Sequence, residues 1–261
     1  KQGFCMMCVM EAHVRKVLRS SVSAIWPKTI IRDLKLIGEE FEPDMAGDAY
    51  EFLRRALEAM QGACLSGNAD LDIAYQTATI IHQIFGGVWR SRVRCLRCLA
   101  ISDLYETFRD VVLDIKDVPS LTVALKDLVT PRKLEREDCF QCGKHEKKIV
   151  FSKTITIHQV AKVFTVCLER AANHNGQKVN KFVEYSEYLD LRPYMSDTGG
   201  ECLFSLYAVV VHSGETCLDG HFFCYTKASN GLWYKMDDEF VDNSDIYTVL
   251  SQQAYLLFYV R

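Results

Sequence analysis

The pattern of apolar residues changes near Gly86-Gly87, and this change constrains the fold more than any other feature of the chain. Before it, apolar residues recur at helical spacing, most clearly over residues 48–63. After it come short runs rich in Val, Ile, Phe and Tyr, at 149–158, 161–168, 204–212, 220–227, 232–236 and 255–260. Long crossover helices are scarce there, so an antiparallel sheet is expected. The sequence therefore predicts an α+β fold whose first ~85 residues are helical.

The composition narrows the class of protein. The chain has 261 residues, 49% hydrophobic and 25% charged, which suits one large or two small globular domains. A net charge of −3 argues against a nucleic-acid binder. No run approaches the ~18 apolar residues of a membrane span, and the first residues do not form a signal peptide. Eleven scattered cysteines, without an obvious disulfide framework, favour a reducing intracellular compartment.

A histidine and a carboxylate occur on two aromatic runs that flank a turn signal. His221 lies in the run 220–225, Asp237 lies in the run 233–238, and Asn230-Gly231 stands between them. On neighbouring strands the two side chains could touch, because cross-strand Cβ atoms lie roughly 5 Å apart. A carboxylate that orients an imidazole makes a general base, which serves a nucleophile. The alternative is a histidine without a catalytic role, whose hydrogen bonds are satisfied within an aromatic hairpin.

Ligand-type residues at metal-binding spacing occur in two places. Cys95 and Cys98 form one CxxC pair, and a second element contains Cys139, Cys142 and His145. Two such pairs can close a tetrahedral zinc site, because each short loop presents two ligands to one side of the ion. The second pair is either Cys139 with Cys142 or Cys142 with His145. Free thiols near a charged loop are the alternative to a zinc ribbon.

Two acidic residues mark the start of the clearest predicted helix. Asp48 and Glu51 are three residues apart, so both would lie at its positive N-terminal end. Capping of the helix is the simplest role for such a pair.

The order of these motifs resembles that of the ubiquitin-specific protease family. The similar segments are the helix start at 48–53, the stretch 82–87, the two cysteine elements, the boxes at 220–221 and 233–238, and the segment 252–259. They cover essentially the whole chain and are most similar to the nuclear and nucleolar branch of the family and its testis-expressed relatives. So many motifs in the same order make a chance similarity very improbable.

The resemblance implies a papain-like cysteine protease fold, described as a right hand, within a single domain. Residues 1–85 would form a helical thumb. Residues 86–200 would form the fingers with a zinc ribbon and part of the antiparallel β palm, and residues 201–261 would complete the palm.

The resemblance also implies a reaction and a partner. In this family a cysteine thiolate attacks the carbonyl after the last glycine of ubiquitin, and water then hydrolyses the acyl-enzyme. By resemblance, His221 is the general base and Asp237 orients it. Ubiquitin and ubiquitinated proteins are the implied partners of a monomer in the nucleus or cytoplasm, with neither nucleic acid nor membrane involved.

Other residues acquire roles by the same resemblance. Asp48 and Glu51 would bind the arginine-rich C-terminal tail of ubiquitin, as carboxylates pair well with guanidinium groups. Phe222 and Tyr225 would help to wall the channel that admits this tail. The preferred ligands of a structural Zn²⁺ are Cys95, Cys98, Cys142 and His145, with Cys139 as the alternative.

The chain departs from the family at the nucleophile. The family cysteine lies in a Gly-Asn-Thr-Cys-Tyr or similar box near the start of the domain, and this sequence contains no such box. The family strand motif Leu-Lys-Arg-Phe is here Leu168-Glu169-Arg170-Ala171. We therefore expect no hydrolysis by the chain as given. Its parent protein is expected to be an active thiol-dependent deubiquitinase, and the alternative is a catalytically inactive pseudoprotease that still binds ubiquitin.

Overall fold

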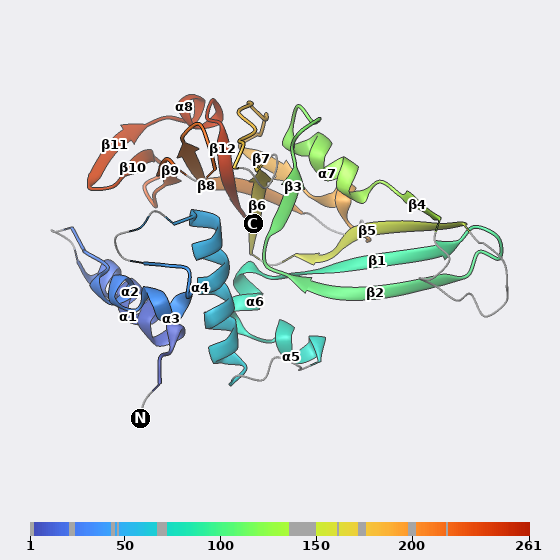
Figure 1. Ribbon diagram of the computed structural model, residues 1–261, viewed down its shortest axis with the longest axis horizontal. Helices are drawn as coiled ribbons and strands as arrows, with labels where there is room; N and C mark the ends of the chain where they lie inside the picture. The colour runs from blue at the N-terminus through green and yellow to red at the C-terminus, as the bar shows by residue number, and fades with distance from the viewer. Residues whose placement is uncertain are drawn as a thin grey trace. The chain divides into compact units, whose positions relative to one another are not determined.

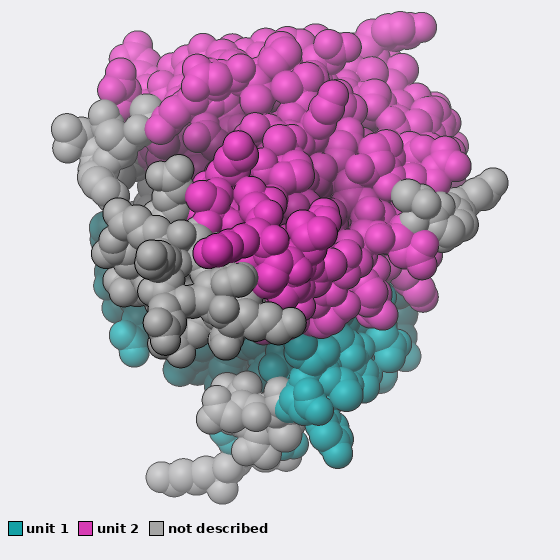
Figure 2. Space-filling view, turned by 90° about the vertical axis from the view of Figure 1, so that its right-hand side faces the viewer, with its two compact units in different colours: residues 1–84 teal, residues 85–261 magenta. Residues whose placement is uncertain are grey.

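The computed structural model describes residues 3–20, 24–42, 45, 47–66, 72–135, 150–160, 162–171, 176–197, 202–217 and 219–261. Cys139, Cys142 and His145 of the expected zinc site lie outside the described residues. Two compact units are formed by residues 1–84 and 85–261, as Figure 2 shows by colour.

The first unit is helical, as the apolar spacing predicted. Its helices are α1 (Met6–Arg19), α2 (Lys28–Arg32), α3 (Leu34–Ile37), α4 (Ala49–Cys64), α5 (Ile73–Thr77) and α6 (Ile80–Phe85) (Figure 1). Helices α1 and α3 pack against α4. The buried apolar side chains of this unit are Met6, Ile37, Phe41, Ala56, Leu57, Met60 and Ile81. None of the described helices combines the length and apolar character that a membrane crossing requires.

The second unit begins with an antiparallel sheet of four strands. The long strands β1 (Gly87–Cys95), β2 (Ile101–Phe108) and β5 (Val150–Val160) extend side by side away from the larger sheet (Figure 1). With β4 (Arg132–Glu135) the strand order is β2-β1-β5-β4. Helix α7 (Leu121–Val129) precedes β4 and contributes Leu121 and Leu125 to the core.

The larger sheet has eight strands and carries the candidate site. Its order is β11-β10-β9-β8-β12-β6-β3, with β7 beside β8. The strands are β3 (Val111–Asp114), β6 (Val163–Glu169), β7 (Tyr188–Asp190), β8 (Leu203–Ser213), β9 (His221–Lys227), β10 (Trp233–Asp237), β11 (Phe240–Ser244) and β12 (Ala254–Val260). Helix α8 (Ile246–Leu250) leads into β12, and the short 3-10 helix η1 (Arg192–Tyr194) follows β7. The expected antiparallel pairing is confirmed except at β3, which pairs with β6 in parallel.

The core of the second unit lies along the central strands of this sheet. Strand β6 is buried from Val163 to Leu168, as expected for a strand that is covered on both faces. Buried tyrosines keep their hydroxyls satisfied: Tyr185 donates to Val249 O at 2.6 Å and Tyr259 donates to Ser186 O at 2.7 Å. These contacts join the segment just before β7 to helix α8 and to strand β12.

Candidate active site

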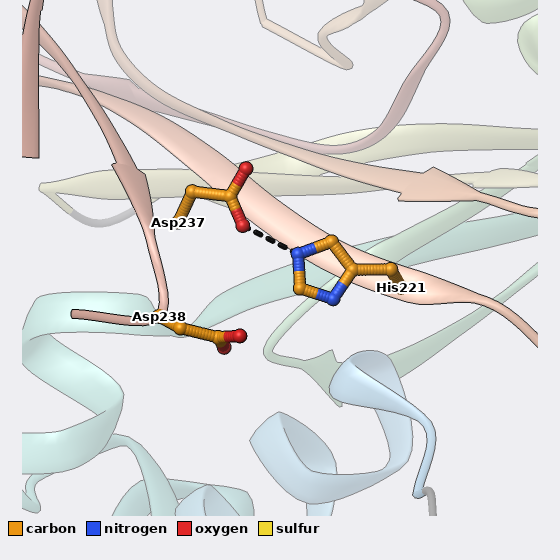
Figure 3. Close-up of side chains that lie close together, drawn as sticks. All are labelled: His221, Asp237 and Asp238. Carbon is orange, nitrogen blue, oxygen red and sulfur yellow. Dashed lines mark hydrogen bonds and ion pairs between the residues drawn. The ribbon is translucent and has the colours of Figure 1, made fainter. Parts of the chain in front are cut away.

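The predicted contact between His221 and Asp237 is present. Strands β9 and β10 are antiparallel with register pairs from Trp233↔Lys227 to Met236↔Cys224. If this register continues, Asp237 faces Phe223, so His221 is a diagonal neighbour on the same face of the sheet. His221 Nε2 and Asp237 Oδ1 form a hydrogen bond, drawn as the dashed line in Figure 3.

The turn that joins the two strands is longer than a two-residue turn. Residues 228–232 connect β9 to β10, and Ala228 N–H donates to Leu232 O at 2.9 Å. Gly231 has φ of 82°, a left-handed conformation that suits glycine. Asn230 Oδ1 accepts from Leu232 N–H at 2.9 Å. The Asn-Gly signal therefore located the turn but did not predict its length.

The hydrogen bond determines which imidazole nitrogen can act as a base. Asp237 Oδ2 also accepts from Lys235 Nζ at 2.8 Å, which favours an ionised carboxylate. An ionised carboxylate only accepts, so Nε2 of the neutral imidazole must carry the hydrogen. His221 Nδ1 then keeps its lone pair. The site thus presents Nδ1 as the proton acceptor.

The charges around the pair strengthen this base. The hydrogen bond to Asp237 raises the pKa of His221 above its ordinary value, and the charge of Asp238 adds to the rise. Lys235 first and His221 second lower the pKa of Asp237. The carboxylate therefore stays ionised beside an imidazole that binds a proton readily.

Three neighbours of this pair were not identified from the sequence. Lys235 Nζ lies 4.4 Å from the centre of the Phe223 ring, and that ring stacks 6.3 Å from His221. Asp238, which has φ of 53°, lies close to His221 and Asp237, with side-chain polar atoms of all three within 4.8 Å of one another (Figure 3). Strand alternation could have indicated two of them, because Phe223 and Lys235 each stand two residues from a predicted site residue.

The aromatic residues predicted to wall a channel lie in different surroundings. Alternation along β9 directs Phe222 to the face opposite His221, where its ring lies 4.5 Å from the His212 ring. Tyr225 is only 5% exposed and belongs to the core. Contact of either residue with a ligand stays a prediction.

Asp48 caps helix α4 in the first unit, and Glu51 lies in the first turn of that helix. Asp48 is the N-cap residue, and its Oδ1 accepts from Glu51 N–H at 2.9 Å. The Glu51 carboxylate lies 3.1 Å from Arg54 Nη1 and 3.0 Å from Arg55 Nε. The simplest predicted role, capping, is therefore confirmed for Asp48, whereas the Glu51 side chain pairs with arginines of the same helix. A role in binding a basic peptide stays a prediction.

Of the predicted zinc ligands, Cys95 and Cys98 lie within the described residues. Cys95 ends β1 and is fully buried, and Cys98 lies in the turn that follows. Cys95 pairs with Phe151, and Glu135 pairs with Val150, so the strand ends Glu135 and Val150, between which Cys139, Cys142 and His145 occur in the sequence, lie near this turn. Thiolate and imidazole donors suit zinc. The donor types therefore suit the ion, and the zinc site stays a prediction.

Comparisons with known proteins identify relatives across the whole chain. The family model described as ubiquitin carboxyl-terminal hydrolase matches residues 1–259. The chain is 48% identical to human ubiquitin carboxyl-terminal hydrolase 42 over 261 residues, which is 100% of this chain and 20% of that protein. It is 43% identical to human ubiquitin carboxyl-terminal hydrolase 17-like protein 11 over 258 residues, 98% of this chain and 48% of that protein. The chain thus spans less than half the length of either relative.

Solved structures share the fold. The yeast SAGA DUB module superposes with a TM-score of 0.79 at 26% identity, covering 98% of this chain and 57% of that chain. The SAGA Ubp8/Sgf11/Sus1/Sgf73 DUB module bound to ubiquitin aldehyde superposes with a TM-score of 0.81 at 25% identity. The match covers 98% of this chain and 59% of that chain. The predicted α+β fold of helical thumb and antiparallel palm is thereby confirmed. The chain belongs to the ubiquitin carboxyl-terminal hydrolase family, and within it to the ubiquitin-specific proteases.

Proposed function

We propose that this chain is the ubiquitin-recognising part of a thiol-dependent deubiquitinase, with His221 as general base and Asp237 as the residue that orients it. The observation that carries the proposal is the hydrogen bond from His221 Nε2 to Asp237, which leaves Nδ1 able to accept a proton. Family membership and a structural neighbour bound to ubiquitin aldehyde support ubiquitin as the ligand.

In the proposed reaction His221 moves a proton twice. Nδ1 takes the proton of a cysteine thiol, and Asp237 stabilises the imidazolium. The thiolate attacks the carbonyl carbon of the last glycine of ubiquitin and forms a thioester, while the C–N bond after that carbonyl breaks and the amine leaves with the proton from Nδ1. Nδ1 then takes a proton from water, the resulting hydroxide attacks the thioester, and the thiol departs with that proton.

The thiol for this reaction is not among the described residues near His221. No cysteine in the described part of the chain joins the group of His221, Asp237 and Asp238. Cys224, three residues further along β9, points to the opposite face, and burial raises the pKa of its thiol. The second candidate function is a pseudoprotease that binds ubiquitin without hydrolysing it. It is favoured by Ala171, which stands where the family strand motif Leu-Lys-Arg-Phe has phenylalanine. For the chain as given, we predict binding without hydrolysis under either function.

Asp48 and Glu51 are the proposed partners of the basic tail of ubiquitin. Both already stabilise α4, so a charge reversal would confuse binding with folding. Asp48→Asn removes the charge and keeps a good N-cap, since Asn and Asp cap helices equally well. Glu51→Gln removes the second charge and sacrifices only exposed ion pairs, which contribute little to stability.

Calorimetry with ubiquitin tests the proposal. We expect saturable binding by the wild-type chain and at least roughly tenfold weaker binding by Asp48→Asn/Glu51→Gln, because hydrogen bonds to charged groups contribute about 1.5–3 kcal/mol. Glu58→Gln is the matched control, because Glu58 lies on the same helix with its side chain 62% exposed. A folded wild-type chain that does not bind ubiquitin would contradict the proposed function. An equal loss of affinity for ubiquitin in the control and in the double variant would contradict the role of the two carboxylates.

We also propose a structural zinc ion held by Cys95, Cys98, Cys142 and His145, with Cys139 as the alternative fourth ligand. The placement of the Cys95–Cys98 turn beside the ends of the segment 136–149 supports it. Zinc would hold the tip of the four-stranded sheet together and would take no part in the reaction.

A further inference from the structure

Lys178 binds the start of the loop that leads into His221. Its Nζ donates to His212 O at 2.8 Å and to Gly214 O at 2.9 Å. His212 lies near the end of β8, and Gly214 directly follows that strand. One lysine therefore holds two carbonyls at the point where the chain leaves β8 and turns towards β9.

The residues beside Lys178 hold the same loop through their backbone. Cys217 N–H donates to Gly176 O at 3.0 Å, and Gln177 forms an antiparallel bridge with Thr216. This segment is itself fixed, because the buried Arg170 donates through Nη1 to Val179 O and Lys181 O, both at 2.9 Å. Lys178 therefore lies in a segment that is itself held in place by hydrogen bonds from Arg170.

The loop closes on itself immediately before His221. A Cβ atom on Gly214 would lie 2.4 Å from Asp219 O, and a Cβ on Gly220 would lie 2.4 Å from both His212 Nε2 and Ser213 O. The two ends of the loop are therefore in direct contact. Ser213 is also the register partner of His221 across β8 and β9. A displacement of His212 or Gly214 would pass directly to the backbone of His221.

We propose that Lys178 is a positioning residue, which holds the His212 and Gly214 carbonyls and thereby keeps the His221 imidazole in hydrogen-bond contact with Asp237. This inference rests on the proposed role of His221 as the general base. Lys178 acts through the loop, whereas the charges that alter the pKa of His221 belong to Asp237, Asp238 and Lys235. A change in that pKa after substitution of Lys178 would therefore report the position of the imidazole.

The test is an NMR titration of the His221 ring together with hydrogen exchange of the loop amides. In Lys178→Met we expect the pKa of His221 to fall towards the ordinary histidine value of about 6.5, because the bond to Asp237 loosens. Amides of the loop should exchange at least roughly tenfold faster. Lys178→Arg should retain wild-type values, because a guanidinium can donate to both carbonyls.

Lys181→Met is the matched control. Lys181 lies in the same segment, and its Nζ donates to Lys116 O at 3.0 Å, far along the chain from the loop. For this variant we expect the His221 pKa and the exchange rates of the loop amides to match those of the wild type. A folded Lys178→Met protein with an unchanged His221 pKa would overturn the proposal, even if its stability had fallen.

Should Lys178→Met fail to fold, Lys178→Gln provides the decision. Its side chain is shorter than that of lysine and carries no charge, so it cannot hold the His212 and Gly214 carbonyls as Lys178 does. A fall of the His221 pKa is therefore expected, and no fall would overturn the proposal. The measurement needs neither ubiquitin nor a nucleophile. A chain that does not bind ubiquitin would therefore contradict the proposed function without affecting this test.

Discussion

At the scale of single residues, Asp237 controls the basicity of His221. Its hydrogen bond is the first cause of the raised pKa of His221, so Asp237→Asn should lower that pKa, as measured by NMR titration of the imidazole. Asp242→Asn is the control, because Asp242 pairs with Lys235 in the register of β10 and β11 but does not act on His221. Equal His221 pKa values in the two variants would contradict the assignment.

The same pair should stabilise the protein within a defined pH window. Because the pKa of His221 is raised, its contribution is complete below the ordinary value of about 6.5 and is lost as the pH rises through the folded value. Because the pKa of Asp237 is lowered, its contribution is complete above about 3.9 and is lost as the pH falls through the folded value. The difference in unfolding free energy between wild type and Asp237→Asn should therefore be largest between about pH 4 and 6.5.

Residues differ in how far the sequence could reveal their contacts. Two strand-like runs and a turn signal indicated that His221 and Asp237 could touch, because neighbouring strands bring their side chains within reach of one another. The register that places both on one face depends on the length of the turn, which the sequence did not predict. The contacts of Lys178 could not be predicted in this way. Its partners are backbone carbonyls, and the first belongs to His212, 34 residues away. No pattern of side chains shows which backbone carbonyls will accept a hydrogen bond from a lysine.

At the scale of elements, two glycines should respond oppositely to alanine. A Cβ at Gly62 or Gly231 would meet no heavy atom within 4 Å, so only backbone conformation distinguishes them. Gly62 lies within α4, where alanine should stabilise by about 0.5–1 kcal/mol. Gly231 has φ of 82° in the turn between β9 and β10, where alanine should destabilise by about 1–2 kcal/mol. Chemical denaturation measures both, and a loss of stability in Gly62→Ala would contradict the argument.

Strands were predictable where their residues form a continuous apolar run. The six apolar runs correspond to β5, β6, β8, β9, β10 and β12. Strands β1 and β2 were not predicted, because their exposed faces carry charged residues instead of an apolar alternation. Arg92 and Asp103 are register partners there and form a bidentate ion pair. Arg92 Nε lies 2.7 Å from Asp103 Oδ1, and Arg92 Nη2 lies 2.6 Å from Asp103 Oδ2. Cross-strand charge pairs hold such a ribbon, and a search for apolar runs does not detect them.

At the scale of the whole molecule, the order of motifs was sufficient to predict the family and its fold. The change from helices to strands also occurs where the apolar pattern predicted it, with α6 ending at Phe85 and β1 beginning at Gly87. The zinc ligands illustrate the limit of such reasoning. Spacing alone left two choices for the second pair, because Cys139 with Cys142 and Cys142 with His145 are equally separated.

Metal analysis of purified variants should resolve that choice. We expect about one zinc ion per wild-type chain, and little zinc in Cys95→Ser or Cys142→Ser, because a tetrahedral site that loses a ligand binds far more weakly. If His145 is the fourth ligand, His145→Ala loses zinc while Cys139→Ser keeps it, and the reverse result would assign Cys139. Cys64→Ser, which alters an exposed cysteine of α4, should keep its zinc.

The zinc prediction also has a structural consequence. Cys95 and Phe151 pair near the end of the four-stranded sheet, beside the strand ends Glu135 and Val150, so the ion would join both ends of the segment 136–149 to the turn after β1. Chelation should then increase hydrogen exchange in β4 and the adjoining half of β5 more than in β6 and β12, which are buried in the larger sheet. A wild-type chain that binds no zinc, or whose β4 and β5 amides do not respond to chelation, would contradict a structural metal at this site.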